Sequence, residues 1–446
     1  MLLPPIAYMK TYIVILFPLF IIISAHWGDS MKNGLSIPKI SIAIQEQLTQ
    51  MDIASWEEYL TGVAQVVEPL QQLLGATRTE ISELVAQAGS ADNTNDLRLI
   101  NDNAVSAATE LFGKTRSVPM VQELCTTVRD AIAERALELS CRKLFFSGTY
   151  CDLPLALLAV GSDGRKEQTL YADQDYLFLH GLGSADSAQS EEQMADYFGM
   201  LGSLFAAKME EVGISRCSGG IMPVNNDWRG SLPQWQKRLA TMFLFERSDW
   251  EKNIVNLIAL MDTRFVCGDE DLGHYFGKMV RSQARNNPQA MKQMARTVSS
   301  MRLSKGFLGR FVTEAEGVHK GEFNIKLLAW MPLVMSIRLL AVSVRIEETS
   351  TLGRIKRLGD DGHLTEKMAT ELTDAYHIIT RHRIFQQIKR LKRIIDDDSY
   401  INPYELPGCE REELKAAIGW IDELQLMLRS RFSMMASVDH ILLPRL

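Results

Sequence analysis

The sequence lacks the paired cysteines that mark structural zinc sites and thioredoxin-like redox sites. Six cysteines are scattered along 446 residues, and no two of them form a C-x-x-C motif. Dispersed thiols in a chain of this length favour reduced residues that pack as small hydrophobic side chains over a disulfide framework. The six are Cys125, Cys141, Cys151, Cys217, Cys267 and Cys409.

A surplus of basic residues is also lacking. Lys and Arg number 48 and Asp and Glu 55, which gives a formal net charge of −7 at pH 7. A general nucleic-acid-binding protein needs basic residues to neutralise phosphates, so no stable nucleic-acid partner is expected. The chain has 46% hydrophobic and 23% charged residues and no low-complexity tract, which excludes a disordered or fibrous protein.

No comfortable membrane span is visible near the N-terminus. The apolar run at residues 12–25 is shorter than the roughly 20 residues that a spanning helix needs, and Pro18 interrupts it. It can be an export signal, a short membrane anchor, or part of a non-native extension that ends before Met31. We favour the extension and a cytoplasmic protein, because an ordinary soluble sequence begins at Met31. A membrane-anchored protein is the alternative.

Hydrophobic periodicity predicts an α+β protein. Apolar residues recur at three- and four-residue steps from 42 to 143, which indicates helices with a polar break at 89–95. Short apolar runs at 155–160 and 176–180 are typical of buried strands. The predicted regions are an apolar leader or extension (1–30), a helical N-terminal region (31–149), a compact core (150–275) and a helical C-terminal domain (290–440).

The rest of the core mixes both kinds of element. Helices are expected at 191–212 and around 232–245, and a glycine-rich, strand-like segment at 214–222. An apolar run at 255–261 leads into Asp262, which gives this carboxylate a strand-like context.

The most informative residues lie between the two predicted strands. The first strand leads to Gly161-Ser162, where a missing side chain lets backbone N–H groups approach an anion. Ser162 adds a hydroxyl donor, and Arg165 adds a planar guanidinium that suits phosphate oxygens. The candidate nucleotide-binding residues are therefore Gly161, Ser162, Gly164 and Arg165.

Two aspartates precede the second strand. Asp173 and Asp175 are two residues apart, and because strand side chains alternate, both carboxylates should project to one face. Adjacent like charges favour a bound cation, and hard oxygen ligands select Mg²⁺ that also binds nucleotide phosphates. Asp173 and Asp175 are thus the candidate catalytic residues and metal ligands. A tight turn followed by an acidic strand edge is the structural alternative.

The joint pattern resembles a known family. Residues 161–170 read GSDGRKEQTL and residues 173–175 read DQD, similar to the G-S-E-G-R-R-E-Q-T-L and D-Q-D of bacterial nucleotidyltransferases related to protein-PII uridylyltransferase. These belong to the DNA polymerase β-type nucleotidyltransferases. Residues 217–222 and 262–269 resemble later motifs of the family, and residues 305–431 resemble its helical substrate-binding domain.

The resemblance implies a small mixed sheet that binds a nucleoside triphosphate (UTP or ATP) with two Mg²⁺ ions. It implies transfer of a nucleoside monophosphate to an acceptor hydroxyl, plausibly on a PII-like signalling protein. It also implies that Glu167 orients Arg165 or its loop. The acceptor and the base preference stay open.

One departure from the family bears on catalysis. Polymerase β-type enzymes usually present a third carboxylate on a later strand, and residues 212–218 carry none. Glu211, Asp227 and Asp262 are candidates, with Asp262 the best placed as a further metal ligand and an ion pair with Arg264 as its alternative role. The alternative function is a non-catalytic nucleotide-sensing protein that keeps the fold.

Overall fold

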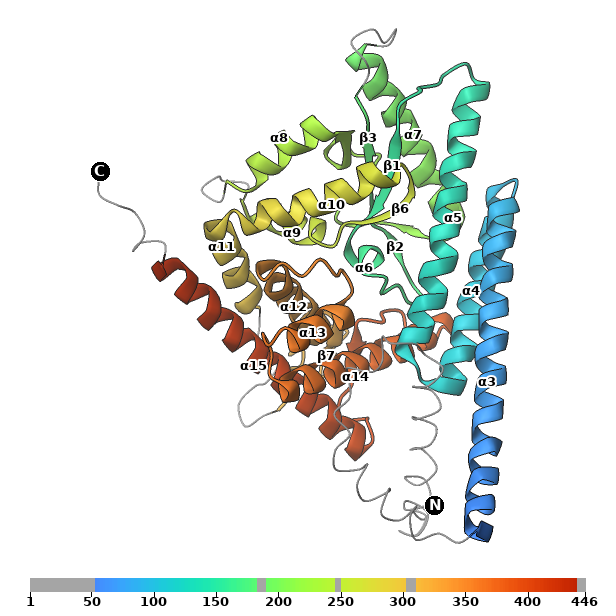
Figure 1. The fold of residues 1–446 in the computed structure, drawn as a ribbon, viewed down its shortest axis with the longest axis vertical. Coiled ribbons are helices and arrows are strands. Elements are labelled where there is room, and N and C mark those ends of the chain that lie inside the picture. Colours follow the sequence, from blue (N-terminus) through green and yellow to red (C-terminus); the bar gives the residue numbers. More distant parts are fainter. Residues whose placement is uncertain (1–52, 183–189, 245–249, 302–309, 439–446) are drawn as a thin grey trace. The chain divides into compact units, whose positions relative to one another are not determined.

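A computed structural model describes residues 53–182, 190–244, 250–301 and 310–438 (Figure 1). Two compact units divide the chain between Glu83 and Leu84. The described part of the first unit belongs to one long helix, α3 (Ile53–Ser90). The apolar run at residues 12–25 lies outside the described residues, and the predicted domain boundaries stay a prediction.

Two capped helices open the second unit. Asn93 accepts hydrogen bonds from the backbone N–H groups of Asn95 and Asp96 at the start of α4 (Thr94–Thr115). Such a side-chain cap satisfies amides that have no partner within the helix. This confirms the predicted break at 89–95. Helix α5 (Val118–Phe146) follows and packs along α4.

A four-stranded mixed sheet forms the centre of the core. Its order is β5 (Arg229–Ser231), β3 (Tyr176–His180), β1 (Leu155–Ala159) and β6 (Arg264–Gly268). Strand β1 is antiparallel to both neighbours, whereas β3 and β5 are parallel. The two predicted strands are confirmed, and both are buried along their length, which explains their continuous apolar sequences.

Helices cover both faces of this sheet. Helix α10 (Glu270–Arg285) packs on β6 and β1 (Figure 1). On α7 (Glu191–Glu211), the Phe205 ring lies 5.6 Å from that of Tyr176 and 5.8 Å from that of Phe178. Alternate residues of β3 thus contact α7, as expected for a strand between two layers. Helix α8 (Leu232–Met242) follows β5 directly.

Two expectations for the core are wrong. The segment 214–222 forms only the two-residue strand β4 (Ser215–Arg216), parallel to β2 (Asp173–Gln174), and its glycines lie in turns. The apolar run at 255–261 belongs mainly to helix α9 (Trp250–Leu260), so Asp262 lies in the turn before β6. A short apolar run does not distinguish a strand from one face of a helix.

The C-terminal domain is helical, as predicted. Its elements are α11 (Pro288–Ser299), β7 (Phe323–Asn324), the π-helix η4 (Lys326–Trp330), α12 (Met331–Ser343), α13 (Thr351–Asp360), α14 (Glu366–Leu391), β8 (Tyr400–Ile401) and α15 (Gly408–Val438). Within the described residues, the segment Lys326–Ser343 is apolar and long enough to cross a membrane, but 72% of it is buried in the protein. Such burial is typical of a core helix.

Gly164 lies where two parts of the core meet. It ends the short helix α6 (Gly161–Gly164), and a Cβ atom built on it would overlap the Asp262 carbonyl oxygen and lie 2.9 Å from that of Ala159. Backbone on both sides cannot move without displacing β1 or the turn before β6. We therefore expect Gly164→Ala to lower the free energy of unfolding by about 3 kcal/mol, measured by urea denaturation.

The matched control is Gly113→Ala on α4, where a new Cβ would meet nothing within 4 Å. There the change should stabilise the protein by about 0.5–1 kcal/mol, because alanine favours a helix. Equal effects of the two substitutions would contradict the close approach at Gly164.

Candidate active site

The turn at Gly161-Ser162, which follows β1 and is called here the glycine corner, lies against the second aspartate, Asp175. Gly161 has a φ of +60°, and a Cβ atom on it would lie 2.6 Å from Asp175 Oδ2. The N–H of Val160 donates to the Asp175 carbonyl oxygen at 2.9 Å. Glycine is required at this position because it adopts a positive φ readily and because a side chain would collide with the Asp175 carboxylate. The structure thus brings together the corner and the carboxylate that the sequence placed 14 residues apart.

The two aspartates project away from Gln174. The Gln174 side chain is buried and donates to the carbonyl oxygens of Ala206 (3.1 Å) and Ile214 (2.9 Å). Because strand residues alternate, Asp173 and Asp175 face the opposite side, where Asp173 is exposed and Asp175 half-buried. The expected projection to one face is confirmed, although the pair belongs to β2 and its end and not to β3.

Burial makes the Asp175 carboxylate easy to protonate. Burial raises its pKa to about 6, and the charge of Asp173 adds to the rise against a hydrogen bond from the Cys217 thiol. Burial also raises the pKa of Asp173, while the nearby Lys326 ammonium lowers it. A divalent cation would relieve the repulsion between the two carboxylates.

Charged groups of the C-terminal domain surround Asp173. Lys326 begins η4, and its charge acts on both aspartates. Arg390 lies over the Tyr171 ring at 4.4 Å and forms an ion pair with Asp398 at 3.3 Å. The aspartates are therefore at the edge between the core and the helical domain.

The two carboxylates fit a magnesium ion that a nucleotide helps to bind. Within the described residues, no group of three or more His, Cys, Asp and Glu side chains is arranged to hold a metal. Mg²⁺ is commonly bound by one or two carboxylates together with substrate phosphates and water. Asp173 and Asp175 can supply that part of its coordination.

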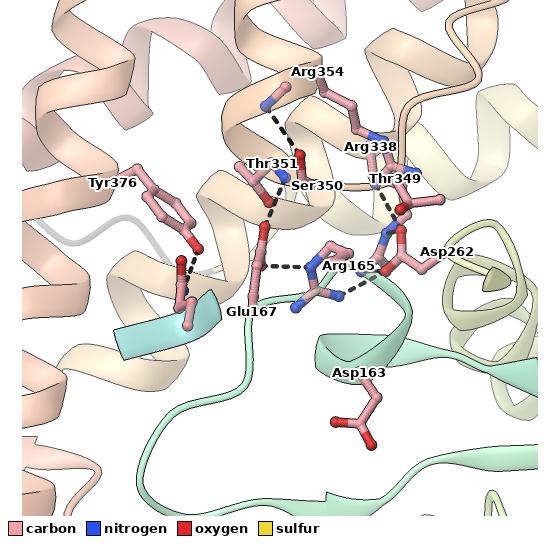
Figure 2. Close-up of polar contacts among 12 residues, drawn as sticks. Asp163, Arg165, Glu167, Asp262, Arg338, Thr349, Ser350, Thr351, Arg354 and Tyr376 are labelled. Carbon is pink, nitrogen blue, oxygen red and sulfur yellow. Dashed lines mark hydrogen bonds and ion pairs between the residues drawn. The ribbon is translucent and has the colours of Figure 1, made fainter. Parts of the chain in front are cut away.

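A buried cluster of charges lies beside the corner (Figure 2). Asp262 is fully buried and accepts hydrogen bonds from Arg165 Nη1 (2.6 Å) and Arg354 Nη1 (2.6 Å). Arg338 Nε donates to the same carboxylate at 2.8 Å. Burial would raise the pKa of Asp262, but the three guanidinium groups outweigh it and the pKa lies below its usual value. We call these four residues the Asp262 cluster.

The residues after Arg165 fix the loop to neighbouring helices. Glu167 accepts from Arg165 Nε (2.7 Å) and from the N–H of Thr351 (2.6 Å), which confirms that it orients Arg165. Arg129 of α5 donates to the carbonyl oxygens of Thr169 and Leu170, at 2.6 and 3.0 Å. The polar residues of this motif are therefore largely structural.

Two family profiles match the chain. Residues 103–248 match the family described as "Putative nucleotidyltransferase DUF294", and residues 288–432 match the "Putative nucleotidyltransferase substrate binding domain". These two regions of the chain belong to the domains of this nucleotidyltransferase family. The matches confirm the resemblance seen in the sequence and support nucleotidyl transfer as the general activity. A comparison with curated proteins gives no match.

Within this nucleotidyltransferase fold, Asp262 does not have its expected roles. Its oxygens are occupied by the three arginines, so it is not available as a metal ligand. Arg264 does not pair with it but forms a bidentate ion pair with Asp130, at 2.8 and 2.9 Å. Arg165, expected to contact phosphate, is 2% exposed and lies between Glu167 and Asp262, so it positions the loop.

Within the described residues, the candidates for a third carboxylate, Glu211, Asp227 and Asp262, have other partners. Asp398 acts on Asp173, however, and the charges of Asp163 and Asp175 act on each other. Glu211 accepts a hydrogen bond from the Thr94 hydroxyl at 2.7 Å, and Asp227 lies near Arg238. The parallel register pairs Asp173 with Ser215, which brings the next facing position, Cys217, beside Asp175. A thiol therefore lies beside Asp175, in the segment 217–222 that resembles one of the family's motifs.

Sequence reasoning missed the helical residues that hold the signature loop. Arg129, Arg338 and Arg354 are all buried and none of them was a candidate. Arg338 carried a usable signal, because it is the one charged residue in the apolar helix α12. The sequence around Arg354 gave no comparable signal, because α13 is rich in polar residues and one more charged residue does not stand out.

Asp163 stands apart from the Asp262 cluster (Figure 2). It is 1% exposed, and within the described residues no hydrogen bond of good geometry reaches its carboxylate oxygens, although the buried Tyr176 hydroxyl lies close enough to interact with them. Burial raises its pKa well above the usual range, and the charge of Asp175 adds to the rise. An ionised Asp163 is therefore costly in the folded protein.

We expect Asp163→Asn to change how stability depends on pH. The pKa of Asp163 is higher in the folded than in the unfolded chain, where it is near 3.8. Above about pH 4 the Asp163 carboxyl ionises in the unfolded chain but stays protonated in the folded protein. The free energy of unfolding of the wild type therefore falls by up to about 1.4 kcal/mol per pH unit, until the carboxyl also ionises in the folded protein. Because asparagine does not ionise, the free energy of unfolding of the variant should not show this fall. It is measured by denaturant unfolding from pH 4 to 8 without nucleotide or metal.

Asp102→Asn, at an exposed carboxylate of α4, is the matched control and should follow the wild-type profile. If Asp163→Asn also gave a parallel profile, the buried carboxyl would not be held neutral.

Proposed function

We propose that the protein is a Mg²⁺-dependent nucleotidyltransferase that moves a nucleoside monophosphate from a nucleoside triphosphate to an acceptor hydroxyl. The contact between the Gly161 corner and Asp175 carries the proposal, because a phosphate-binding edge and a metal-binding carboxylate must be adjacent for this reaction. Family membership agrees with the reaction class.

The glycine corner would hold the triphosphate. Backbone N–H groups in the first turn of a helix have no partner within the helix, and those of Gly161 and Ser162 begin α6. Both residues are partly exposed, and the Ser162 hydroxyl adds a donor. Asp173 and Asp175 would hold Mg²⁺ ions, which when bound neutralise phosphate charge in the transition state.

The reaction balances without a further reagent. The acceptor oxygen forms a bond to the α-phosphorus, the bond from that phosphorus to the bridging oxygen breaks, and pyrophosphate leaves. The hydroxyl proton goes to water or to a carboxylate at the site.

The C-terminal domain would contribute cationic groups to the same site. Lys326 is exposed and lies near both aspartates. Its ammonium can donate to phosphate oxygens, and the leaving pyrophosphate carries most of the charge. This gives the domain described as substrate-binding a direct part in binding the nucleotide.

We further propose UTP or ATP as the donor, a PII-like protein as the acceptor, and a cytoplasmic location. The similarity of the GSDGRKEQTL and DQD motifs to those of proteins related to protein-PII uridylyltransferase supports this choice. Cytosolic nucleotide and magnesium would supply the reaction.

Nucleotide sensing without transfer is the second candidate. It is favoured by one observation, that the thiol of Cys217 lies beside Asp175 while the candidates for a third carboxylate have other partners. A sensor would bind nucleotide with Mg²⁺ but release no pyrophosphate.

The double variant Asp173→Asn with Asp175→Asn tests the proposal. The full chain is incubated with α-labelled UTP or ATP, Mg²⁺ and a purified PII protein, and both labelled protein and pyrophosphate are measured. We expect transfer by the wild type, and a loss of at least about 100-fold in the variant because the metal ligands are removed. Transfer that survives in the double variant contradicts the site, whereas Mg²⁺-dependent nucleotide binding without pyrophosphate supports the sensor.

Lys326→Gln should weaken use of the nucleotide. Loss of one charge-assisted hydrogen bond costs about 1.5–3 kcal/mol, which predicts a fall of about 10- to 100-fold in kcat/KM, with partial rescue by Lys326→Arg. Lys278→Gln, at an exposed lysine of α10, is the matched control and should change kcat/KM little. A normal kcat/KM in Lys326→Gln would exclude the contact without affecting the role of the aspartates.

A further inference from the structure

A cavity lies at the end of the sheet away from the aspartates. It has a volume of about 270 Å³, and the residues that matter for its chemistry are His180, Glu191, Phe198, Arg229, Gln234 and Arg238. Ligand sites commonly have volumes from about 300 Å³ upward, so this cavity suits a small molecule.

The strand register separates this cavity from the nucleotide site. Strand β3 begins at Tyr176, next to Asp175, and ends at His180 in the cavity. His180 is opposite Leu155 at the start of β1, while Tyr176 is opposite Ala159 at its end. At about 3.3 Å per residue, His180 is roughly 16 Å from Asp175.

Arg238 lines the cavity, and the guanidinium of Arg229 lies against Gly199, between this cavity and a neighbouring one, so both arginines bring positive charge to its wall. Arg229 donates to the carbonyl oxygens of Pro223 (3.1 Å) and Val224 (2.8 Å). Arg238 donates to those of Asn226 (3.1 Å) and Arg229 (3.3 Å). All four acceptors are uncharged. Among the described residues, neither guanidinium forms an ion pair within 4.0 Å, although the charge of Asp227 acts on Arg238 from the surface.

Two helices add positive potential by beginning at the same cavity. Glu191 is the first residue of α7 and Gln234 lies in the first turn of α8, and both line the cavity. A helix N-terminus carries a partial positive charge. Glu191 is the one acidic residue in the lining and is itself exposed, so the positive groups predominate.

An aromatic surface completes the cavity. The His180 ring stacks on Phe198, with centroids 4.1 Å apart and an interplanar angle of 6°. Burial lowers the pKa of His180, so the imidazole is neutral near pH 7 and packs as a flat ring. Phe198 and His180 are 2% and 8% exposed, so an apolar group of a ligand can contact the accessible parts of these rings while an anionic group meets the arginines.

We propose that this cavity binds a small organic anion, with its carboxylate or phosphate group at Arg229 and Arg238 and its flat or apolar part against His180 and Phe198. This is a second ligand site, distinct from that of the nucleotide. It lies at the other end of the strand that follows Asp175, and it does not depend on nucleotidyl transfer.

The probes are benzoate, phenyl phosphate and the neutral benzyl alcohol. Binding to the full chain is measured by isothermal titration calorimetry at constant ionic strength. We expect at least one of the two anions to bind more than 10-fold more tightly than benzyl alcohol, and their ratio distinguishes a carboxylate site from a phosphate site. The proposal would be overturned if neither anion bound more tightly than benzyl alcohol.

Ala195→Glu locates the site without disturbing the core. Ala195 is exposed on α7 and lines both this cavity and the neighbouring one that Arg229 also lines, so glutamate there adds a negative charge beside both on a helix that accepts it readily. We expect anion affinity to fall at least 10-fold in Ala195→Glu and to stay within threefold in the neutral control Ala195→Gln. Equal affinities in the two variants would refute the location.

Two further comparisons separate the site from its surroundings. Arg238→Gln should lose anion affinity, whereas Lys237→Gln, at the adjacent exposed residue of α8, should keep it. The double variant of Asp173 and Asp175 should bind the probes as the wild type does. Loss of binding in that double variant would instead place the anion in the nucleotide site and overturn the proposal.

Discussion

The carboxylate of Asp262 is the point on which the rest of the site depends. It is fully buried, and a buried anion is tolerated only when cations and donors surround it. One of its three arginines comes from the signature loop, and the other two come from α12 and α13 of the C-terminal domain. The core and the helical domain therefore cannot separate here without leaving charge unpaired.

This constraint divides the signature motif into two parts. Gly161 and Ser162 are partly exposed at the corner next to Asp175, where a ligand can reach them. From Arg165 to Leu170 the motif is directed into the protein, and its side chains and backbone bind α5, α13 and α14. The first residues of the motif are thus accessible to a ligand, whereas the later ones bind the loop to neighbouring helices. These structural contacts keep Gly161 and Ser162 at a fixed position relative to the aspartates.

The sequence predicted what short-range patterns determine. Alternation along a strand put Asp173 and Asp175 on one face, and a strand ending in glycine located the corner. It could not predict the Asp262 cluster, because its partners are 76 to 97 residues away and no local pattern pairs them. The helix α9 was missed for a related reason, since a seven-residue apolar run satisfies a strand and a helix face equally.

The two ends of β3 have opposite electrostatic character, and this separation has a physical consequence. At one end the charge of Asp173 raises the pKa of Asp175, while at the other, among the described residues, Arg229 and Arg238 donate to neutral carbonyl oxygens and Arg238 also lies over the Trp235 ring. Were these charges adjacent, they would neutralise each other, as Asp262 and its arginines do. A separation of roughly 16 Å is far beyond the distance of an ion pair, about 4 Å. Each end therefore keeps its charge available for a ligand of the opposite sign.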